Sequence, residues 1–268
     1  MSNISVAKET MKITEEGKYI TPSGEVCLPR IDYKRVVVIS PEEGGKLLTR
    51  RMPDSDEIRP GNIKVINADS YRAASQYVYP LVMNFANAHN PGGGFLMGAN
   101  AQEEALCRCS TLYASITSDE AGEMYKYNNS HMSSVESDYM LLSPNVIVFR
   151  DEFLELLPTP FQVGVITIPA PNKRGAALLT GEKKIAETFL RRIRIMLRVA
   201  EKYGYKEVVL GAWGCGAFGN PPEKVAEYFR TVLVDEGYRE FFDEICFAIF
   251  GREDGRNITA FRKVLTGI

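Results

Sequence analysis

The sequence predicts an α/β fold in which helices cover both faces of a mixed sheet. Short apolar segments rich in β-branched residues alternate with longer segments whose apolar residues recur every three or four positions. Two of the short segments, 145–150 and 163–168, are almost continuously apolar. Strands that are apolar on both faces belong in the middle of a sheet with helices on each side. The clearest helix, 182–203, carries one apolar face, as expected for a helix packed on such a sheet.

Residues 1–60 are predicted to form an N-terminal extension that packs on a main domain, 61–268. Within the extension we expect a helix, a turn and two short strands, at 2–20, 21–24, 25–28 and 35–40. The segment 41–61 is richer in proline, glycine and charged residues. We interpret it as the connection between the two parts, with room for a short helix.

The main domain is predicted to begin with the strand 62–67. Asp69 follows this strand and can cap a helix that we expect to extend to Tyr77. The further elements are an apolar segment at 79–85, a helix at 101–116, strands at 145–150, 163–168, 207–210 and 241–249, and helices at 182–203, 224–234 and 257–265. Residues 118–137 are polar and are expected to be irregular, and the sequence leaves open whether they cover a site or are plain surface.

Composition and charge exclude several classes of protein. The 268 residues are 45% hydrophobic and 25% charged, which is typical of a globular protein. No segment approaches the roughly 20 apolar residues that cross a bilayer, so we expect a cytoplasmic protein without membrane contact. With a net charge of −2, direct nucleic-acid binding is not expected, because it requires a basic surface. Arg191, Arg194 and Arg198 are expected on a solvated helix face rather than on a polymer-binding ridge.

Cysteine and histidine are too sparse for several kinds of site. The five cysteines include no Cys-x-x-Cys spacing, so we expect reduced thiols rather than a disulfide framework or a zinc ribbon. With only His89 and His131, a three-histidine metal site is impossible and a histidine-based nucleophile relay is poorly supplied. We therefore expect neither a metal nor a dissociable cofactor.

One stretch, 84–104, concentrates residues that carry chemistry. It begins Asn-Phe-Ala-Asn-Ala-His-Asn-Pro, continues with Gly92-Gly93-Gly94, and reaches Gln102-Glu103-Glu104 seven residues later. Three successive glycines have no side chains to pack, which suits a loop where a ligand lies against the main chain. The two carboxylates fall in the first turn of the next helix, where free N–H groups can hold anions.

A second glycine-rich stretch, 211–220, joins a predicted strand to a predicted helix. It reads Gly-Ala-Trp-Gly-Cys-Gly-Ala-Phe-Gly-Asn, which is neither the Rossmann fingerprint nor a Walker A loop. We interpret it as a strand-end loop whose backbone amides face a diphosphate. Asn220 can cap the next helix, and Trp213 is expected to anchor the core beneath the loop.

Together these motifs resemble the microbial-type poly(ADP-ribose) glycohydrolases. Asn84-Phe85-Ala86-Asn87, Asn90-Pro91, Ala7-Lys8-Glu9-Thr10 and Pro169-Ala170-Pro171-Asn172 also look like this branch, so the resemblance covers most of the chain from about Ala7. It implies a macrodomain-like three-layer α/β/α sandwich. The implied activity is hydrolysis of ribose–ribose O-glycosidic bonds in poly(ADP-ribose), mainly from the chain end, with release of ADP-ribose.

The resemblance also implies partners and setting. Poly(ADP-ribose) or ADP-ribosylated proteins would be the substrates and ADP-ribose the product. The protein would act as a monomer in the reversal of ADP-ribosylation, including the DNA damage response.

The resemblance assigns roles to individual residues. Glu104 would protonate the leaving ribose oxygen and then activate water, while Glu103 would hold hydroxyls of the ribose that becomes the oxocarbenium ion. The other implied substrate-binding residues are Asn87, Gly92, Gly93, Gly94, Gln102, Gly214, Cys215, Gly216, Ala217, Phe218, Gly219 and Asp69. Three alternatives stay open: Asp69 can be a helix cap or an adenine contact, Phe218 a buried plug or a ribose contact, and Asn84 and Asn90 turn caps or further sugar contacts. His89 is expected to pack the loop.

The two glutamates must divide the work. Adjacent helical residues diverge by about 100° around the axis, so they cannot simply flank one glycosidic bond. We expect crowding by Glu103 and partial burial to raise the pKa of Glu104. Two rival functions remain, a non-catalytic ADP-ribose-binding module and a hydrolase of single ADP-ribosyl units. The glutamate pair argues against the first, because a binding module needs no general acid.

Overall fold

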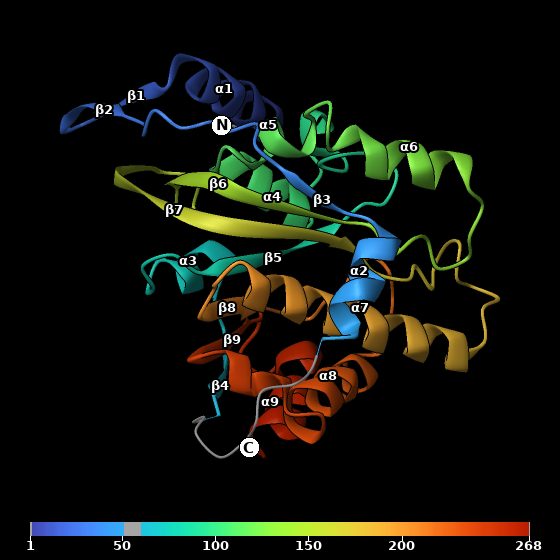
Figure 1. Ribbon diagram of the computed structural model, residues 1–268. Coiled ribbons are helices and arrows are strands. Elements are labelled where there is room, and N and C mark those ends of the chain that lie inside the picture. The colour runs from blue at the N-terminus through green and yellow to red at the C-terminus, as the bar shows by residue number, and fades with distance from the viewer. Residues whose placement is uncertain (1, 51–59, 268) are drawn as a thin grey trace.

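The computed structural model describes residues 2–50 and 60–267 and has one seven-stranded mixed sheet (Figure 1). The strands of this sheet, in spatial order, are β3 (Val37–Ile39), β6 (Met140–Arg150), β7 (Leu156–Pro169), β5 (Leu81–Ala86), β8 (Glu207–Leu210), β9 (Glu244–Ala248) and β4 (Asn62–Ile66). A separate hairpin pairs β1 (Lys18–Thr21) with β2 (Gly24–Cys27). The α/β class and the mixed sheet are confirmed.

The sheet is parallel on one side and antiparallel on the other. Strands β7, β5, β8, β9 and β4 run parallel, whereas β6 runs antiparallel to both β7 and β3. The central strand β5 is almost wholly buried, in keeping with its apolar sequence. All five parallel strands therefore end at the same edge of the sheet.

The helices form two layers, one on each face of the sheet (Figure 1). One face is covered by α1 (Asn3–Glu16), α3 (Ser70–Ala74), α4 (Gln102–Cys109), α5 (Leu112–Ile116) and α6 (Gly122–Ser130). The other is covered by α2 (Pro41–Leu48), α7 (Glu182–Lys202), α8 (Pro222–Arg230) and α9 (Arg256–Leu265). Each layer has its own apolar cluster against the sheet, which gives the three-layer sandwich.

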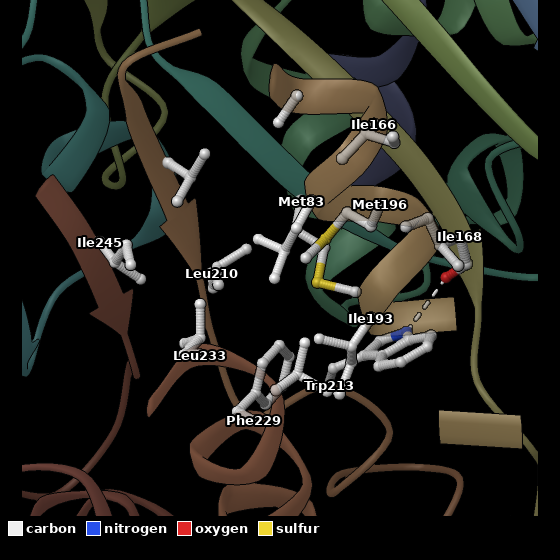
Figure 2. Close-up of a cluster of buried hydrophobic side chains, with 14 of the residues drawn as sticks. Met83, Ile166, Ile168, Ile193, Met196, Leu210, Trp213, Phe229, Leu233 and Ile245 are labelled. Carbon is white, nitrogen blue, oxygen red and sulfur yellow. Dashed lines mark hydrogen bonds between the residues drawn. The ribbon is translucent and has the colours of Figure 1, made fainter. Parts of the chain in front are cut away.

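The larger cluster is built around Trp213 (Figure 2). Its indole is fully buried and donates a hydrogen bond of 3.1 Å to the carbonyl of Ile168 at the end of β7. Its ring meets the Phe189 ring of α7 edge-on, with 4.9 Å between centroids. The predicted core anchor beneath the glycine-rich loop is confirmed, and it fixes the start of that loop to two layers at once.

The N-terminal residues contact the rest of the chain through several elements, of which β3 and α1 are two. β3 forms the edge of the central sheet next to β6. α1 packs on α4, where the Thr10 hydroxyl donates a hydrogen bond of 2.7 Å to the carbonyl of Arg108. The division into an extension (1–60) and a main domain (61–268) stays a proposal.

The predicted helix 101–116 is wrong in its middle. α4 ends at Cys109 because Ser110 leaves the helix to bridge Val148 of β6, and the chain re-enters a helix only at Leu112. The amide of Thr111 then donates to the carbonyl of Ile147 at 3.0 Å. A tertiary strand contact, which no local pattern encodes, ends the first helix.

Two further predictions need correction. The segment 118–137 is not irregular throughout, since it contains α6. Only one narrow face of this helix is buried, formed by Met124, Tyr125 and Asn128, which is why the sequence of the segment looks polar. The helix expected to reach Tyr77 ends at Ala74.

The arginine face of α7 is also different from the prediction. Arg198 is only 2% exposed, donates to the carbonyl of Arg50 at 2.6 Å and lies 4.8 Å above the Phe241 ring. Arg191 is partly exposed and binds Asp138. The expected solvated face is therefore wrong for Arg198, because its aliphatic stem is packed and its guanidinium finds partners inside.

Candidate active site

A pocket of about 650 Å³ opens where the parallel strands end. Its walls come from the ends of β5 and β9, from the residues just beyond β4 and β8, and from the start of α4. In open α/β sheets, ligands bind at the carboxyl ends of the strands. Both predicted glycine-rich loops lie at this edge, so the fold brings together two stretches that are more than 100 residues apart in sequence.

The triple-glycine loop places the backbone against the glutamate pair. Gly93 has a φ of 56°, in the left-handed region that favours glycine. A Cβ atom at Gly93 would lie 2.5 Å from Oε1 of Glu104 and 3.3 Å from Oε2 of Glu103. Only a residue without a side chain fits between the loop and the two carboxylates.

Glu104 closes the loop through both of its oxygens. Oε1 accepts a hydrogen bond of 2.9 Å from the amide of Gly94, and Oε2 accepts one of 2.9 Å from the amide of Ala101. The side chain is 7% exposed. Glu104 therefore holds the two ends of the segment 94–101 together while its carboxylate stays at the first turn of α4.

Glu103 is the more deeply buried carboxylate, at 3% exposed. Oε2 accepts a hydrogen bond of 2.8 Å from the amide of Asn87, and Oε1 accepts one of 3.3 Å from the side-chain amide of Asn84. Burial raises the pKa of Glu103 to about 8, and the charge of Glu104 adds to the rise, whereas the hydrogen bonds oppose it. The folded protein thus keeps a proton on Glu103 at neutral pH. The sequence predicted a raised pKa at Glu104, which stays a prediction, whereas the structure gives a raised pKa to its neighbour Glu103.

Gln102 joins the start of α4 to β5. Its side-chain carbonyl accepts a hydrogen bond of 2.9 Å from the amide of Phe85, and its NH₂ group donates to the carbonyl of Met83 at 2.8 Å and to Ser70 Oγ at 3.2 Å. Gln102 also lines the pocket. These contacts orient the first turn of α4, and with it the glutamate pair.

Asn87 holds the turn that enters the loop. Its Oδ1 accepts hydrogen bonds of 2.9 Å from the amides of His89 and Asn90. Among the described residues, no group accepts a hydrogen bond from the Asn87 NH₂, which leaves this donor for a ligand. His89 itself contacts Asn129 and Glu136, as expected for a residue that packs the loop.

The second glycine-rich loop presents unused backbone donors. No acceptor within residues 2–50 and 60–267 takes the N–H groups of Gly216, Ala217 or Phe218, and all three residues line the pocket. Successive free amides of this kind make an anion-binding concavity. The loop keeps its shape through Gly214 and Gly219, which have φ values of 73° and 70°.

Two of the predicted binding residues in this loop, Cys215 and Gly219, lie outside the pocket wall. Cys215 is half-buried against the core, and burial raises the pKa of its thiol to about 12. Gly219 faces the Arg174 side chain, which a Cβ atom would approach to 2.8 Å. Asn220 does not cap α8; its NH₂ group ties the carbonyls of Pro171 and Gly214 together.

A profile of the microbial-type PARG catalytic domain matches residues 7–151, more than half of the chain and the part that holds the glutamate pair. The chain belongs to the microbial-type PARG family. PARG stands for poly(ADP-ribose) glycohydrolase, so the chain is an enzyme of the glycohydrolase class. A comparison with curated protein sequences gives no match.

Crystal structures of bacterial PARGs extend the similarity to nearly the whole chain. The PARG from Thermomonospora curvata shares 35% sequence identity with a TM-score of 0.91, covering 98% of this chain and 99% of that one. The same protein bound to the inhibitor ADP-HPD gives 34% identity, a TM-score of 0.86 and coverage of 97% and 98%. The PARG from Deinococcus radiodurans in complex with ADP-ribose shares 35% sequence identity with a TM-score of 0.80, covering 90% of this chain and 99% of that one. The macrodomain-like fold is thereby confirmed.

Asp69 can serve both of its predicted roles in this PARG-family protein. Its carboxylate accepts a hydrogen bond of 2.8 Å from the amide of Tyr71, so the predicted cap of α3 is confirmed. It also lines the pocket, and burial raises its pKa. A contact with adenine remains a prediction.

The pocket of this PARG-family protein includes aromatic residues that the sequence argument missed. Phe250 follows β9, lines the pocket and is 78% exposed, and Phe85 and Phe218 line the same pocket. Phe218 lines the pocket and also packs, partly buried, against the larger apolar cluster, so both of its predicted roles stay open. An aromatic residue directly after the last parallel strand is the signal that would have found Phe250, because strand ends meet at the site edge.

The described part of the chain brings together no group of three His, Cys, Asp or Glu side chains that could hold a metal ion. Within the same residues, no helix is both long and apolar enough to cross a membrane.

Proposed function

We propose that this chain hydrolyses ribose–ribose O-glycosidic bonds of poly(ADP-ribose), from the chain terminus, and releases ADP-ribose. One juxtaposition carries the proposal: a buried glutamate pair lies directly against the glycine loop 92–94, beside a pocket lined by the free amides of 216–218. The free backbone amides can bind a diphosphate, and the two glutamates can supply acid–base catalysis next to it. The Deinococcus relative is bound to ADP-ribose, which agrees with this assignment.

In the proposed reaction Glu104 is the acid and then the base. It would protonate the ribose oxygen that leaves as the glycosidic bond breaks, and it would then take a proton from the attacking water. The raised pKa of Glu103 means that the carboxyl pair already holds a proton at neutral pH.

The remaining residues would bind and orient the substrate. Glu103 and the free NH₂ group of Asn87 would hold hydroxyls of the reacting ribose. Phe218 would pack on that ribose, and Asp69 would receive the adenine amino group. The remaining proposed positions are the backbone of Gly92, Gly93, Gly94, Gly214, Cys215, Gly216, Ala217 and Gly219, and the side chain of Gln102.

The replacement Glu104→Gln tests the proposal. We expect release of ADP-ribose from purified poly(ADP-ribose) to fall at least ~100-fold, the usual scale for loss of a positioned acid, while calorimetric ADP-ribose binding persists. Glu253→Gln, which changes an exposed carboxylate paired with Arg262, is the matched control and should keep full turnover.

Three other outcomes would change the assignment. Near-normal turnover in Glu104→Gln would remove Glu104 from its role. Binding without turnover by the wild type would indicate a non-catalytic ADP-ribose-binding module. Release only of single ADP-ribosyl units from modified proteins would indicate a mono-ADP-ribosyl hydrolase.

A further inference from the structure

Beneath Glu103 lies an amide side chain that the proposed reaction does not use. Asn84, on β5, is completely buried. Its NH₂ group is shared between Oε1 of Glu103, at 3.3 Å, and the hydroxyl of Thr167 on β7, at 3.1 Å. Its carbonyl oxygen Oδ1 is also buried, and no group in the described chain donates a hydrogen bond to it.

A buried amide oxygen without a partner is costly and calls for an explanation. An asparagine amide carries a donor and an acceptor at opposite ends, and a half-turn of the amide exchanges them. With its NH₂ toward Glu103, Asn84 suits a charged carboxylate. With its carbonyl toward Glu103, it suits a protonated carboxyl that donates an O–H. The Thr167 hydroxyl can donate or accept, so it serves both arrangements.

We propose that Asn84 is a positioning residue that holds Glu103 in both protonation states, by presenting its NH₂ group to the carboxylate and its carbonyl oxygen to the neutral acid. This inference rests on the proposed function for its consequence: Glu103 would keep its place against the ribose hydroxyls while its charge changes. In the observed orientation Oδ1 has no donor; a half-turn would place Oδ1 against Glu103 and Thr167 and move the NH₂ group to the side where the described chain offers no partner.

The environment of Glu103 allows that charge change near neutral pH. Burial raises its pKa to about 8. The titratable groups that face it are Glu104 and Cys107 of α4 and Tyr125 of α6. Burial raises the pKa values of Cys107 and Tyr125 well above their usual range, so both stay neutral in this window. Cys107 and Tyr125 therefore contribute no charge change near neutral pH.

The direct test is a carbon-13 NMR titration of the Glu103 carboxyl, assigned with Glu103→Gln, in the wild type and in Asn84→Leu. Leucine has a similar volume but removes both the NH₂ group and the carbonyl oxygen of Asn84. The charged form of Glu103 then loses more stabilisation than its neutral form, because a charged acceptor makes the stronger hydrogen bond. We expect the titration midpoint of the Glu103 carboxyl to be higher in Asn84→Leu than in the wild type, by about one pH unit or more. The side-chain nitrogen signal of Asn84 should titrate with the midpoint of Glu103 in the wild type.

A matched control and a second variant keep the test decisive. Ser143→Ala removes a buried hydrogen bond to Ser115 on neighbouring elements and should leave the midpoint unchanged. If Asn84→Leu does not fold, the isosteric Asn84→Asp is measured, and its added acid should raise the midpoint further. The alkaline limb of the kcat/KM profile on poly(ADP-ribose) should move with the NMR midpoint.

Two results would overturn the inference. One is a Glu103 titration midpoint that is the same in the Asn84 variant and in the wild type. The other is an Asn84 amide signal that does not change as Glu103 titrates. Neither readout requires turnover by the wild type, so failure of the proposed hydrolase activity would be recognised separately.

Discussion

At the scale of single residues, the site depends on a backbone position that tolerates no side chain. Gly93 combines a left-handed φ with a direct approach to both carboxylates. The same closeness gives Glu103 a buried place beside Glu104, so the loop geometry and the titration of the pair are linked. Two predictions follow from these two features.

Gly93→Ala should disable the site. The new Cβ would need to lie 2.5 Å from Oε1 of Glu104 and to adopt a left-handed φ, which costs about 1–3 kcal/mol. We expect kcat/KM on poly(ADP-ribose) to fall at least ~10-fold, since small misplacements of catalytic groups have effects of this order or larger. Gly45→Ala, in α2 with open space around its Cβ, is the control and should be neutral or stabilising in thermal unfolding. Unchanged activity in Gly93→Ala would show that the glutamates move aside freely.

Glu103 should make the stability of the protein depend on pH. The folded protein keeps this proton up to a pH of about 8, whereas the unfolded chain releases it near the ordinary glutamate pKa of 4.5. Between these values the folded state binds more protons, so the free energy of unfolding falls as pH rises and levels off above about 8. Urea unfolding near pH 6 and pH 8.5 should show this loss in the wild type and less of it in Glu103→Gln. Equal losses in both proteins would contradict the raised pKa.

At the scale of elements, the junction of β5 with α4 decides where the catalytic pair lies. The strand ends at Ala86, the glycine loop follows, and Gln102 ties the helix back to the strand through two backbone groups and Ser70. Ala101, at the N-cap position, has no side chain that can cap the helix, so the helix start is fixed by Gln102 and by the Glu104 carboxylate, which accepts from the Ala101 amide.

Gln102→Leu should loosen this junction. It leaves the amide of Phe85 and the carbonyl of Met83 without partners, at about 1–3 kcal/mol for each buried group. We expect a lower Tm and a lower kcat together, because the first turn of α4 carries the glutamates. Gln162→Leu, which breaks one hydrogen bond of 3.3 Å to Pro144, is the control and should change kcat little. A Tm loss without a kcat loss would limit Gln102 to a structural role.

At the scale of the whole molecule, the N-terminal residues support the site from outside. The side-chain amide of Asn3 donates to the carbonyl of Gly98 in the glycine loop at 3.0 Å, and α1 packs on α4. Glu9 also forms an ion pair with the buried Arg150 of β6. These contacts connect the proposed extension to the segment that carries the glutamates.

Deletion of residues 1–34, which removes α1 and the β1–β2 hairpin, should therefore lower both Tm and activity. It exposes the apolar groups that Val6, Ala7 and Ile13 cover. The replacement Glu15→Ala, at an exposed position of α1, is the control and should change neither quantity. Thermal unfolding and ADP-ribose release check the prediction, and full activity after the deletion would show that 1–34 are dispensable for the catalytic domain.

Local patterns predicted the elements that local physics controls. The apolar runs at 145–150 and 163–168 predicted central strands, although the strands are longer, at Met140–Arg150 and Leu156–Pro169. Both extend because they pair with each other across the turn between them. Helix α6 was missed because only a narrow face of it is buried.

The sequence by itself determined the α/β class, the two glycine-rich loops, the glutamate pair and the core role of Trp213, because each depends on residue type and spacing. The tertiary structure alone decided the break of the helix at Ser110, the burial of Arg198, the raised pKa of Glu103 and the idle oxygen of Asn84. Each of these depends on groups far apart in the chain. Burial and hydrogen bonding arise from that packing, and no local pattern of residues contains it.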